Sequence, residues 1–187
     1  LYIVSSTGSQ ELAYNQSGYI IGAVALANLD GDNDLEIVFA TQSSSNGKVF
    51  AIHHDGSDVT GFPVDIAEKV IVGPAVADLE NDGVMDIVAV SWDNHIHVFD
   101  ANGAVKTGFP FETSNRFNSP ATLVDLDGDG DLEIVAGNDN GNLYVLHHDA
   151  TIMAEFDTGD DIRGGIAVAD LESNGSLELL FTGYDDH

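Results

Sequence analysis

The sequence predicts an all-β protein, a β-propeller built from four-stranded antiparallel blades. The first observation is a nine-residue acidic pattern that occurs four times, with starts about 45 to 50 residues apart, a period typical of propellers and other repeat architectures. The second is the short apolar, β-branched run after each copy, because such runs bounded by turn residues favour strands. The third is that the two termini carry complementary parts of one repeat.

The acidic pattern predicts a set of metal-binding loops. Oxygen-bearing side chains occupy positions 1, 3, 5 and 9, and position 6 is Gly or Asn, which tolerates a left-handed backbone that wraps around an ion. Ca²⁺ prefers about six to eight oxygens, and alternate residues of a tight turn can direct theirs to one point. Ordinary acidic turns are the alternative, but four copies in register favour ligation of up to four Ca²⁺ ions, with a backbone carbonyl at position 7. The predicted ligands are Asn28, Asp30, Asp32, Asp34 and Glu36; Asp78, Glu80, Asp82, Val84 and Asp86; Asp125, Asp127, Asp129, Asp131 and Glu133; and Asp170, Glu172, Asn174, Ser176 and Glu178.

Each repeat contains four candidate strands. In the first repeat, a small apolar strand at 22–27 precedes the loop, a second at 37–40 follows it, and a third at 48–53 comes after a polar turn. A short fourth strand is predicted to lead out through residues 60–63, and through 107–110 and 154–156 in the next two repeats. Four antiparallel strands in a repeat of this length form the blade of a propeller.

The ends of the chain predict how the propeller closes. The fourth repeat stops after its second strand, whereas residues 1–8 and 11–14 match a third and a fourth strand. The sequence therefore predicts one domain over 1–187 with four blades, at about 20–66, 70–112, 117–158, and 162–187 plus 1–17. Such a blade, made from both termini, leaves no open edge. The alternative is a segment of a longer array with arbitrary ends.

Composition excludes several classes of partner and chemistry. A formal charge of −27 with only 5 Lys and Arg residues argues against binding to nucleic acid or anionic membranes. No apolar run is long enough for membrane insertion, and the absence of cysteine excludes disulfides, thiolate zinc sites and a cysteine nucleophile. Loosely built calcium sites fill only where calcium is millimolar, which predicts an extracellular or cell-surface location.

Two segments carry a resemblance to a known family. Residues 74–83, PAVADLENDG, and 120–130, PATLVDLDGDG, resemble the FG-GAP/VCBS repeat of integrin α-subunit propellers and many bacterial surface proteins. The resemblance covers essentially the whole chain and implies propeller blades with Ca²⁺ between their first two strands. The chain departs from it in two respects. Integrin propellers have seven blades, and here Asn28 and Asn174 replace acids, which weakens the first loop slightly and the fourth loop more. The third loop, with five acids, is the strongest predicted site.

Histidine and aromatic residues suggest further sites. The histidines are His53, His54, His95, His97, His147, His148 and His187. Imidazole suits Zn, Cu and Ni, but adjacent histidines on a strand point to opposite faces, which argues against a transition-metal site. Trp92 and Tyr184 follow second strands, where loops gather, and an exposed ring there could stack on a sugar; packing is the alternative.

The sequence predicts a binding module and no enzyme. It lacks the common hydrolase, metalloprotease and phosphate-loop motifs, so no catalytic residue and no cofactor other than Ca²⁺ is expected. The expected role is structural, adhesive or self-assembling. The expected partner is a protein or glycan at the cell surface, or another copy through strand exchange. The alternatives are a lectin-like propeller, or a catalytic or non-catalytic part of a polysaccharide-acting enzyme.

Overall fold

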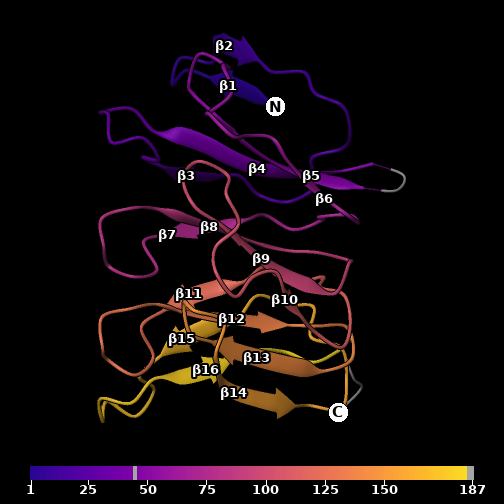
Figure 1. Ribbon diagram of the computed structural model, residues 1–187, viewed down its shortest axis with the longest axis vertical. Helices are drawn as coiled ribbons and strands as arrows, with labels where there is room; N and C mark the ends of the chain where they lie inside the picture. Colours follow the sequence, from indigo (N-terminus) through magenta and orange to yellow (C-terminus); the bar gives the residue numbers. More distant parts are fainter. Residues whose placement is uncertain (44–45, 185–187) are drawn as a thin grey trace.

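The computed structural model describes residues 1–43 and 46–184, and the strands in them form five antiparallel sheets (Figure 1). The three four-stranded sheets follow one another down the longest axis of the molecule. They confirm the predicted all-β fold with four-stranded, blade-like sheets. The first contains β3 (Ala25–Ala27), β4 (Glu36–Gln42), β5 (Gly47–Ile52) and β6 (Val64–Ile66); the second β7 (Ala75–Ala77), β8 (Asp86–Val90), β9 (His95–Phe99) and β10 (Phe111–Glu112); the third β11 (Thr122–Val124), β12 (Glu133–Gly137), β13 (Asn142–Leu146) and β14 (Ile152–Asp157).

Within each four-stranded sheet, the strands lie side by side in the order of the chain. The fourth strands differ from the prediction. β6 and β10 begin after Pro63 and Pro110 rather than across them, because proline has no N–H to donate to a neighbouring strand. β14 is longer than the predicted segment 154–156. No helix in the described residues is long and apolar enough to cross a membrane.

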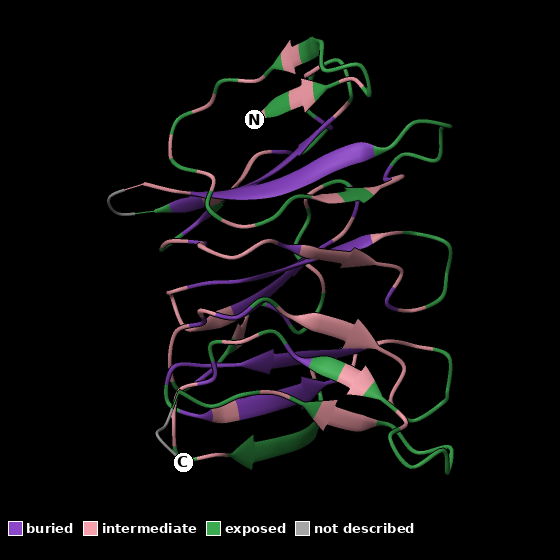
Figure 2. Ribbon diagram, turned by 180° about the vertical axis from the view of Figure 1, so that it is seen from behind, coloured by how far each residue is buried: buried purple, intermediate pink, exposed green. Residues whose placement is uncertain are grey.

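The core lies between the sheets, and the central strands are buried on both faces (Figure 2). Successive side chains of a strand point to opposite faces. In β4, Val38 and Ala40 therefore join the apolar cluster shared with the second blade, whereas Ile37 and Phe39 join the cluster on the other side. β8 and β12 repeat this alternation between their own neighbours. Each blade thus contributes one apolar face to each adjacent blade.

The first strands of neighbouring blades approach each other closely. A Cβ atom on Gly22 would lie only 2.2 Å from the backbone nitrogen of Gly73, so a larger residue does not fit there. Between the later blades, Thr122 Oγ1 donates a hydrogen bond to the carbonyl of Ile166 at 2.9 Å. The small residues of the predicted first strands therefore occur where the blades converge, as in a propeller.

The predicted closure of the ring is not present in the described residues. β1 (Tyr2–Val4) pairs with β2 (Gln10–Ala13), and β15 (Ala167–Ala169) pairs with β16 (Glu178–Leu180), but the two pairs form separate sheets. They lie toward opposite ends of the molecule (Figure 1). The β1–β2 hairpin packs its apolar side on the first blade, and β15–β16 packs on the third. Residues 185–187 of the predicted fourth blade, including His187, lie outside the described residues.

The arrangement of the blades explains this difference. Closing a ring with four blades requires a quarter turn between neighbours, whereas the three complete blades succeed one another along the long axis (Figure 1). Each partial blade covers the apolar face of its neighbour in sequence, and this burial does not require the two partial blades to meet.

Candidate metal centres

The four acidic loops connect the first and second strands of each blade, as predicted. They join β3 to β4, β7 to β8, β11 to β12 and β15 to β16, and they project from the same side of the molecule, at the left in Figure 1. Most of their side chains are exposed, but the acid at position 9 is buried in the first three loops. The loops are therefore open to ions from solvent and anchored in the blades.

In the third loop, backbone N–H groups hold the acidic side chains in place. Asp125 accepts hydrogen bonds from Gly128 N at 2.7 Å and Gly130 N at 3.2 Å. Asp127 accepts one from Asp129 N at 3.2 Å. Carboxylate oxygens of Asp125, Asp127 and Asp129 all lie within 4.8 Å of one another. Since Ca²⁺ prefers carboxylate and carbonyl oxygens, the residues of this loop fit calcium.

Left-handed backbone occurs at the predicted position 6 in three of the four loops, and also at position 4 in all four. All four residues at position 4 have positive φ angles, and position 6 adds three glycines, but Asn33 at position 6 of the first loop does not. The residues at position 4 are Gly31 (φ 82°), Asn81 (53°), Gly128 (80°) and Ser173 (55°). Asn and Ser reach this conformation with less strain than larger side chains when their polar groups bond locally.

The acids at position 9 have a structural partner that the sequence did not reveal. Glu36 and Glu133 each accept a hydrogen bond at 2.7 Å from the N–H of the leucine at position 2, and Asp86 accepts one at 3.3 Å. Their exposed fractions are 0, 0 and 2%. One carboxylate oxygen at position 9 therefore closes the base of the loop, and the other lies beside His53, Lys106 or His147, which reach it from later in the blade.

Histidines complete the first and third loops. His53 Nδ1 lies 3.3 Å from Glu36 Oε1, and His147 Nδ1 lies 3.2 Å from Glu133 Oε1. These histidines form groups of potential ligand atoms with Asp30 and Glu36, and with Asp127 and Glu133. Sequence analysis missed this contact, although the signal was there. The histidine pair recurs at the end of the third strand in the first and third blades, and the second blade has Asp100 and Ala101 instead.

Not all predicted ligands converge. Two carboxylates at position 7 lie beside histidines instead. Asp34 Oδ2 is 3.4 Å from His54 Nδ1, and Asp131 Oδ2 is 3.3 Å from His148 Nε2. In the described residues, neither the second nor the fourth loop brings three acidic or histidine ligand atoms together as the first and third loops do. The geometry thus favours the third loop, as predicted, followed by the first.

We expect the four loops to contribute unequally. Replacing Asp127 and Asp129 together by Ala should remove one bound Ca²⁺ per chain, because it deletes two of three converging carboxylates. It should lower the melting temperature in calcium by about 5–10 °C, since a site at 100 times its Kd contributes about 2.7 kcal/mol. Replacing Glu172 and Asn174 together by Ala is the matched change in the fourth loop, and it should lower the melting temperature and the bound calcium much less. Calcium titration by calorimetry and thermal melting measure both effects; equal losses from the two pairs would contradict the ranking.

The second loop holds an internal cation. The ammonium group of Lys106 contacts a carboxylate oxygen of Glu80 and lies 2.9 Å from Asp86 Oδ1. The hydrogen bond from Lys106 lowers the pKa of Glu80, whereas burial raises the pKa of Asp86. Burial alone would lower the pKa of Lys106, but its bonds to both acids outweigh burial and raise it. A Ca²⁺ ion in this loop must compete with a fixed positive charge.

Removing that charge should strengthen calcium binding at the second loop. In Lys106→Gln, Glu80 and Asp86 lose their competing cation, and the affinity of this loop should rise roughly tenfold, a change of about 1.4 kcal/mol. The matched control is Lys48→Gln, because Lys48 pairs with Asp65 at 2.5 Å on β5 and β6, away from the loops. Calcium titration of both variants checks the expectation, which fails if Lys106→Gln leaves every affinity unchanged.

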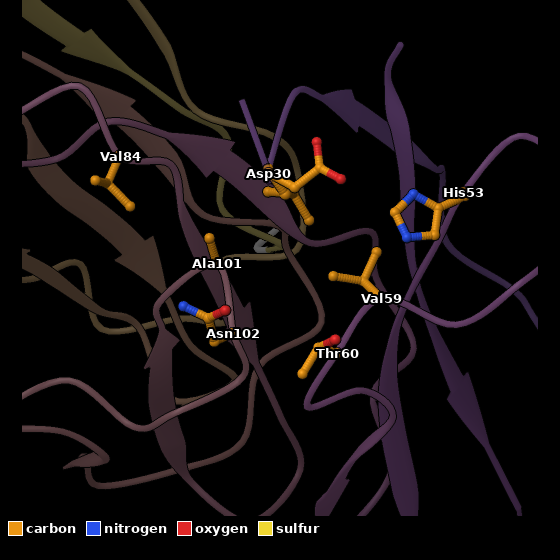
Figure 3. A pocket seen from close by; sticks show the side chains of 8 residues that line it. Asp30, His53, Val59, Thr60, Val84, Ala101 and Asn102 are labelled. Carbon is orange, nitrogen blue, oxygen red and sulfur yellow. The ribbon is translucent and has the colours of Figure 1, made fainter. Parts of the chain in front are cut away.

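A cavity of about 300 Å³ lies between the first loop and the second blade (Figure 3). Asp30 and His53 line it beside Val59 and Thr60, and Val84, Ala101 and Asn102 complete its wall. Two members of the metal-ligand group of the first loop therefore face open space rather than protein. The cavity has room for water or for a partner's oxygen beside these ligand atoms.

The opposite edge of the blades carries most of the positive charge of the chain. Three of the 5 basic residues gather there with two aromatic rings, in a cluster that we call the basic row. Its members are Lys69, Trp92, Arg116, Asn118, Asp139, Arg163 and Tyr184. Trp92, Asp139 and Tyr184 occupy equivalent places after the second strands of successive blades, since their N–H groups donate to Lys69 O, Arg116 O and Asp161 O respectively.

Hydrogen bonds and cation–π contacts connect the basic row. Arg116 Cζ lies 4.4 Å from the centre of the Trp92 ring, and Arg116 Nε donates to Asp139 at 2.8 Å. Arg163 Nε also donates to Asp139, at 3.2 Å, and its Cζ lies 4.8 Å from the Tyr184 ring. Burial alone would raise the pKa of Asp139, but bonds from Arg116 and its neighbours outweigh burial and lower it. Tyr184 is 70% exposed, so this ring is available to a ligand.

Comparison with known sequences matches the repeat seen in the structure. The FG-GAP-like repeat family matches three times, over residues 28–89, 78–136 and 125–181. Every match begins at position 1 of an acidic loop and extends beyond the next loop. No curated protein matches the chain.

Solved structures with a similar fold include propellers and a biofilm protein. The biofilm matrix protein Bap1 of V. cholerae matches with a TM-score of 0.66 and 22% identity, over 87% of this chain and 28% of its own. BamB from Moraxella catarrhalis matches with a TM-score of 0.67 and 18% identity, over 94% of this chain and 47% of its own. The computationally designed Ika4 protein matches with a TM-score of 0.58 and 12% identity, over 90% of this chain and 94% of its own. At these identities the likeness concerns the fold, and the chain spans less than half of the first two proteins.

Proposed function

The chain belongs to the FG-GAP-like repeat family, and from that premise we propose that it is a calcium-binding, propeller-like module that works outside the cell or at its surface. The observation that carries the proposal is the convergence of Asp125, Asp127 and Asp129 in an exposed loop whose backbone already positions their carboxylates. Bound calcium would neutralise these acids and join the first two strands of each blade. The function is binding and assembly rather than catalysis.

Calcium would be held by different ligand sets in the four loops. In the third loop, Asp125, Asp127 and Asp129 supply carboxylates, and Glu133 adds its remaining oxygen from the base. In the first loop, Asp30 and Glu36 supply the acids. The second and fourth loops would bind more weakly, because Lys106 occupies one and the other has only three acids. Exposed loops of this kind suit millimolar calcium, which supports a location outside the cell.

The partial blades at the two ends support self-assembly. The hairpin β1–β2 presents Tyr2 and Val4 to solvent, with exposed fractions of 69 and 56%, and the other end presents Phe156 and Leu180, with 61 and 40%. Figure 2 shows β14 exposed along its length. A hairpin from a second copy could complete β15–β16, which lacks its third and fourth strands, by adding strands to the open edge. The fold of a biofilm matrix protein is compatible with such a role.

Sedimentation of the chain in calcium tests self-assembly. Strand exchange predicts a dimer or larger species whose population rises with protein concentration and falls when a chelator empties the loops. A chain that remains monomeric at all concentrations in calcium would rule out self-assembly, and calcium titration would still decide the metal function separately.

A second candidate function is carbohydrate binding at the basic row. The exposed ring of Tyr184 and the guanidinium groups of Arg116 and Arg163 provide a stacking surface beside hydrogen-bond donors. A glycan array probed with the wild-type chain and with Tyr184→Ala tests it. The matched control is Tyr19→Ala, because Tyr19 is 74% exposed and lies outside the row. Binding lost only in Tyr184→Ala supports a lectin function; no binding, or equal binding by both variants, removes it.

A further inference from the structure

A second kind of metal site lies away from the acidic loops. Asp93, His95 and His97 each offer one potential ligand atom, and these atoms lie within 4.8 Å of one another. Asp93 follows the end of β8, whereas the acidic loop of this blade ends where β8 begins. The group shares no residue with the calcium loops and uses two imidazoles in place of carboxylates. We propose that Asp93, His95 and His97 bind one transition-metal ion of the Zn²⁺ type.

The strand geometry brings the two imidazoles together. His95 and His97 are separated by one residue in β9, so they point to the same face of the sheet. The intervening residue, Ile96, points the other way into the core shared with the third blade. The argument that adjacent histidines diverge applies to His53–His54 and His147–His148 but not to this pair.

The turn between β8 and β9 fixes the carboxylate. Asp93 Oδ1 accepts a hydrogen bond from His95 N at 3.1 Å, and Asp93 N donates to Ser91 Oγ at 3.3 Å. Asn94, with a φ of 69°, supplies the left-handed residue that the turn requires. The side chain of Asp93 is 10% exposed, so the carboxylate is held in a defined position close to both histidines.

The distances suit a tetrahedral ion. Zn²⁺ binds imidazole nitrogen and carboxylate oxygen at about 2.0–2.2 Å, which places neighbouring ligand atoms about 3.3 Å apart. A single carboxylate oxygen, Asp93 Oδ1, lies 3.2 Å from His97 Nε2 and 3.5 Å from His95 Nδ1. Two imidazoles with one carboxylate form a donor set that Zn²⁺ and its neighbours bind readily and Ca²⁺ does not prefer.

Burial differs across the group in the way that an accessible metal site requires. The His97 side chain is 11% exposed, and its ring stacks on Phe99 with centroids 6.1 Å apart and planes 11° apart. This contact fixes the orientation of the ring. The side chain of His95 is 29% exposed and gives access from solvent. Without an ion, His95 Nδ1 lies 2.7 Å from the Asp93 carbonyl and can donate to it, so the group is satisfied in both states.

Zinc binding in the presence of calcium tests the proposal. The chain, kept in millimolar CaCl₂ so that the loops are filled, is dialysed against buffered micromolar Zn²⁺, and both metals are measured by mass spectrometry. We expect one Zn²⁺ per chain in the wild type. His95→Ala and Asp93→Asn should each weaken zinc binding by about tenfold or more. Even a substitution of a residue that only contacts a metal ligand lowers metal affinity by about 10- to 100-fold. Their calcium content should stay unchanged.

The double variant His53→Gln, His147→Gln identifies the competing site. Both residues adjoin the acidic loops, so zinc that is lost in this variant and kept in His95→Ala would belong to the loops and would overturn the proposal. Absence of bound zinc in the wild type would overturn it as well. Unchanged calcium-dependent melting of His95→Ala shows that a loss of zinc is not a loss of fold. Co²⁺ in place of Zn²⁺ adds a spectroscopic signature, an intense visible absorption for four-coordinate geometry that His95→Ala should abolish.

Discussion

Removal of calcium is expected to lower the melting temperature of this protein by about 10 °C or more. Each occupied site at 100 times its Kd contributes about 2.7 kcal/mol, and 1 kcal/mol shifts the melting temperature of a chain of this size by about 2–4 °C. The empty third loop leaves the carboxylates of Asp125, Asp127 and Asp129 facing one another without a counter-ion. Half of the 32 acidic residues lie in the four loops, so their repulsion is concentrated there.

The measurement is a pair of melting curves, one in millimolar calcium and one in chelator. Magnesium at the same concentration is the control, and it should restore little of the stability because it demands a smaller, nearly octahedral set of ligands. Added monovalent salt at matched ionic strength separates specific binding from general screening of the charge. Coincident curves in calcium and chelator would refute calcium binding as the basis of the fold's stability.

Deletion of residues 1–15 is expected to cause aggregation or loss of folding. The hairpin covers the outer face of the first blade, where Phe39 and Phe50 stack with ring centroids 5.0 Å apart. The Tyr14 ring packs edge-on against both, with its centroid 6.0 Å from that of Phe39 and 6.3 Å from that of Phe50. The surface that this deletion would expose therefore lies on the first blade.

Single substitutions at Tyr14 make this expectation quantitative. Tyr14→Ala should destabilise the fold by about 2–4 kcal/mol, because it removes a ring packed on two buried phenylalanines. Burial, and then the hydrogen bond to Asp58, raises the pKa of Tyr14 to about 12. Tyr14→Phe is the matched control, which keeps the ring and loses only the 2.9 Å hydrogen bond, at about 1 kcal/mol. Denaturant unfolding measures both changes in stability.

The deletion has its own contradicting outcome. A chain without residues 1–15 that stays monomeric with unchanged melting would show that the β1–β2 hairpin is not part of the folded stack.

The sequence predicted the repeat and its strands well because each is a local pattern. Turn residues, alternation and the acid at position 9 specify the loop between the first two strands wherever they occur, as at Asp125–Glu133. The predicted closure of the ring is not shown by the structure, for a different reason. It depends on the rotation between successive blades, which side chains at several interfaces determine jointly. The match in length between the two partial blades carries no information about that rotation.

The site was predicted less completely than the fold. Ligand positions 1, 3 and 5 followed from spacing, but Lys106 and His53 reach the loops from later parts of their blades. Their contribution depends on pairing between strands, which single-residue patterns do not encode. The proposed group at Asp93, His95 and His97 does not follow from residue type, because all seven histidines look alike in composition. Alternation along β9 separates this pair from the adjacent pairs.

The alternation of core residues between two faces has a consequence for how the molecule unfolds. Every central strand divides its side chains between the preceding and the following sheet, so stability resides in contacts between nearest neighbours and resembles a linear chain of coupled units. The terminal sheets have one such neighbour each, and the sheet β7–β10 has two complete ones. Local opening therefore starts at the ends and moves inward. We expect amide hydrogens in β8 and β9 to exchange last, because these strands pack on a complete blade at each face, and the middle blade can then serve as the base on which lost repeats re-form.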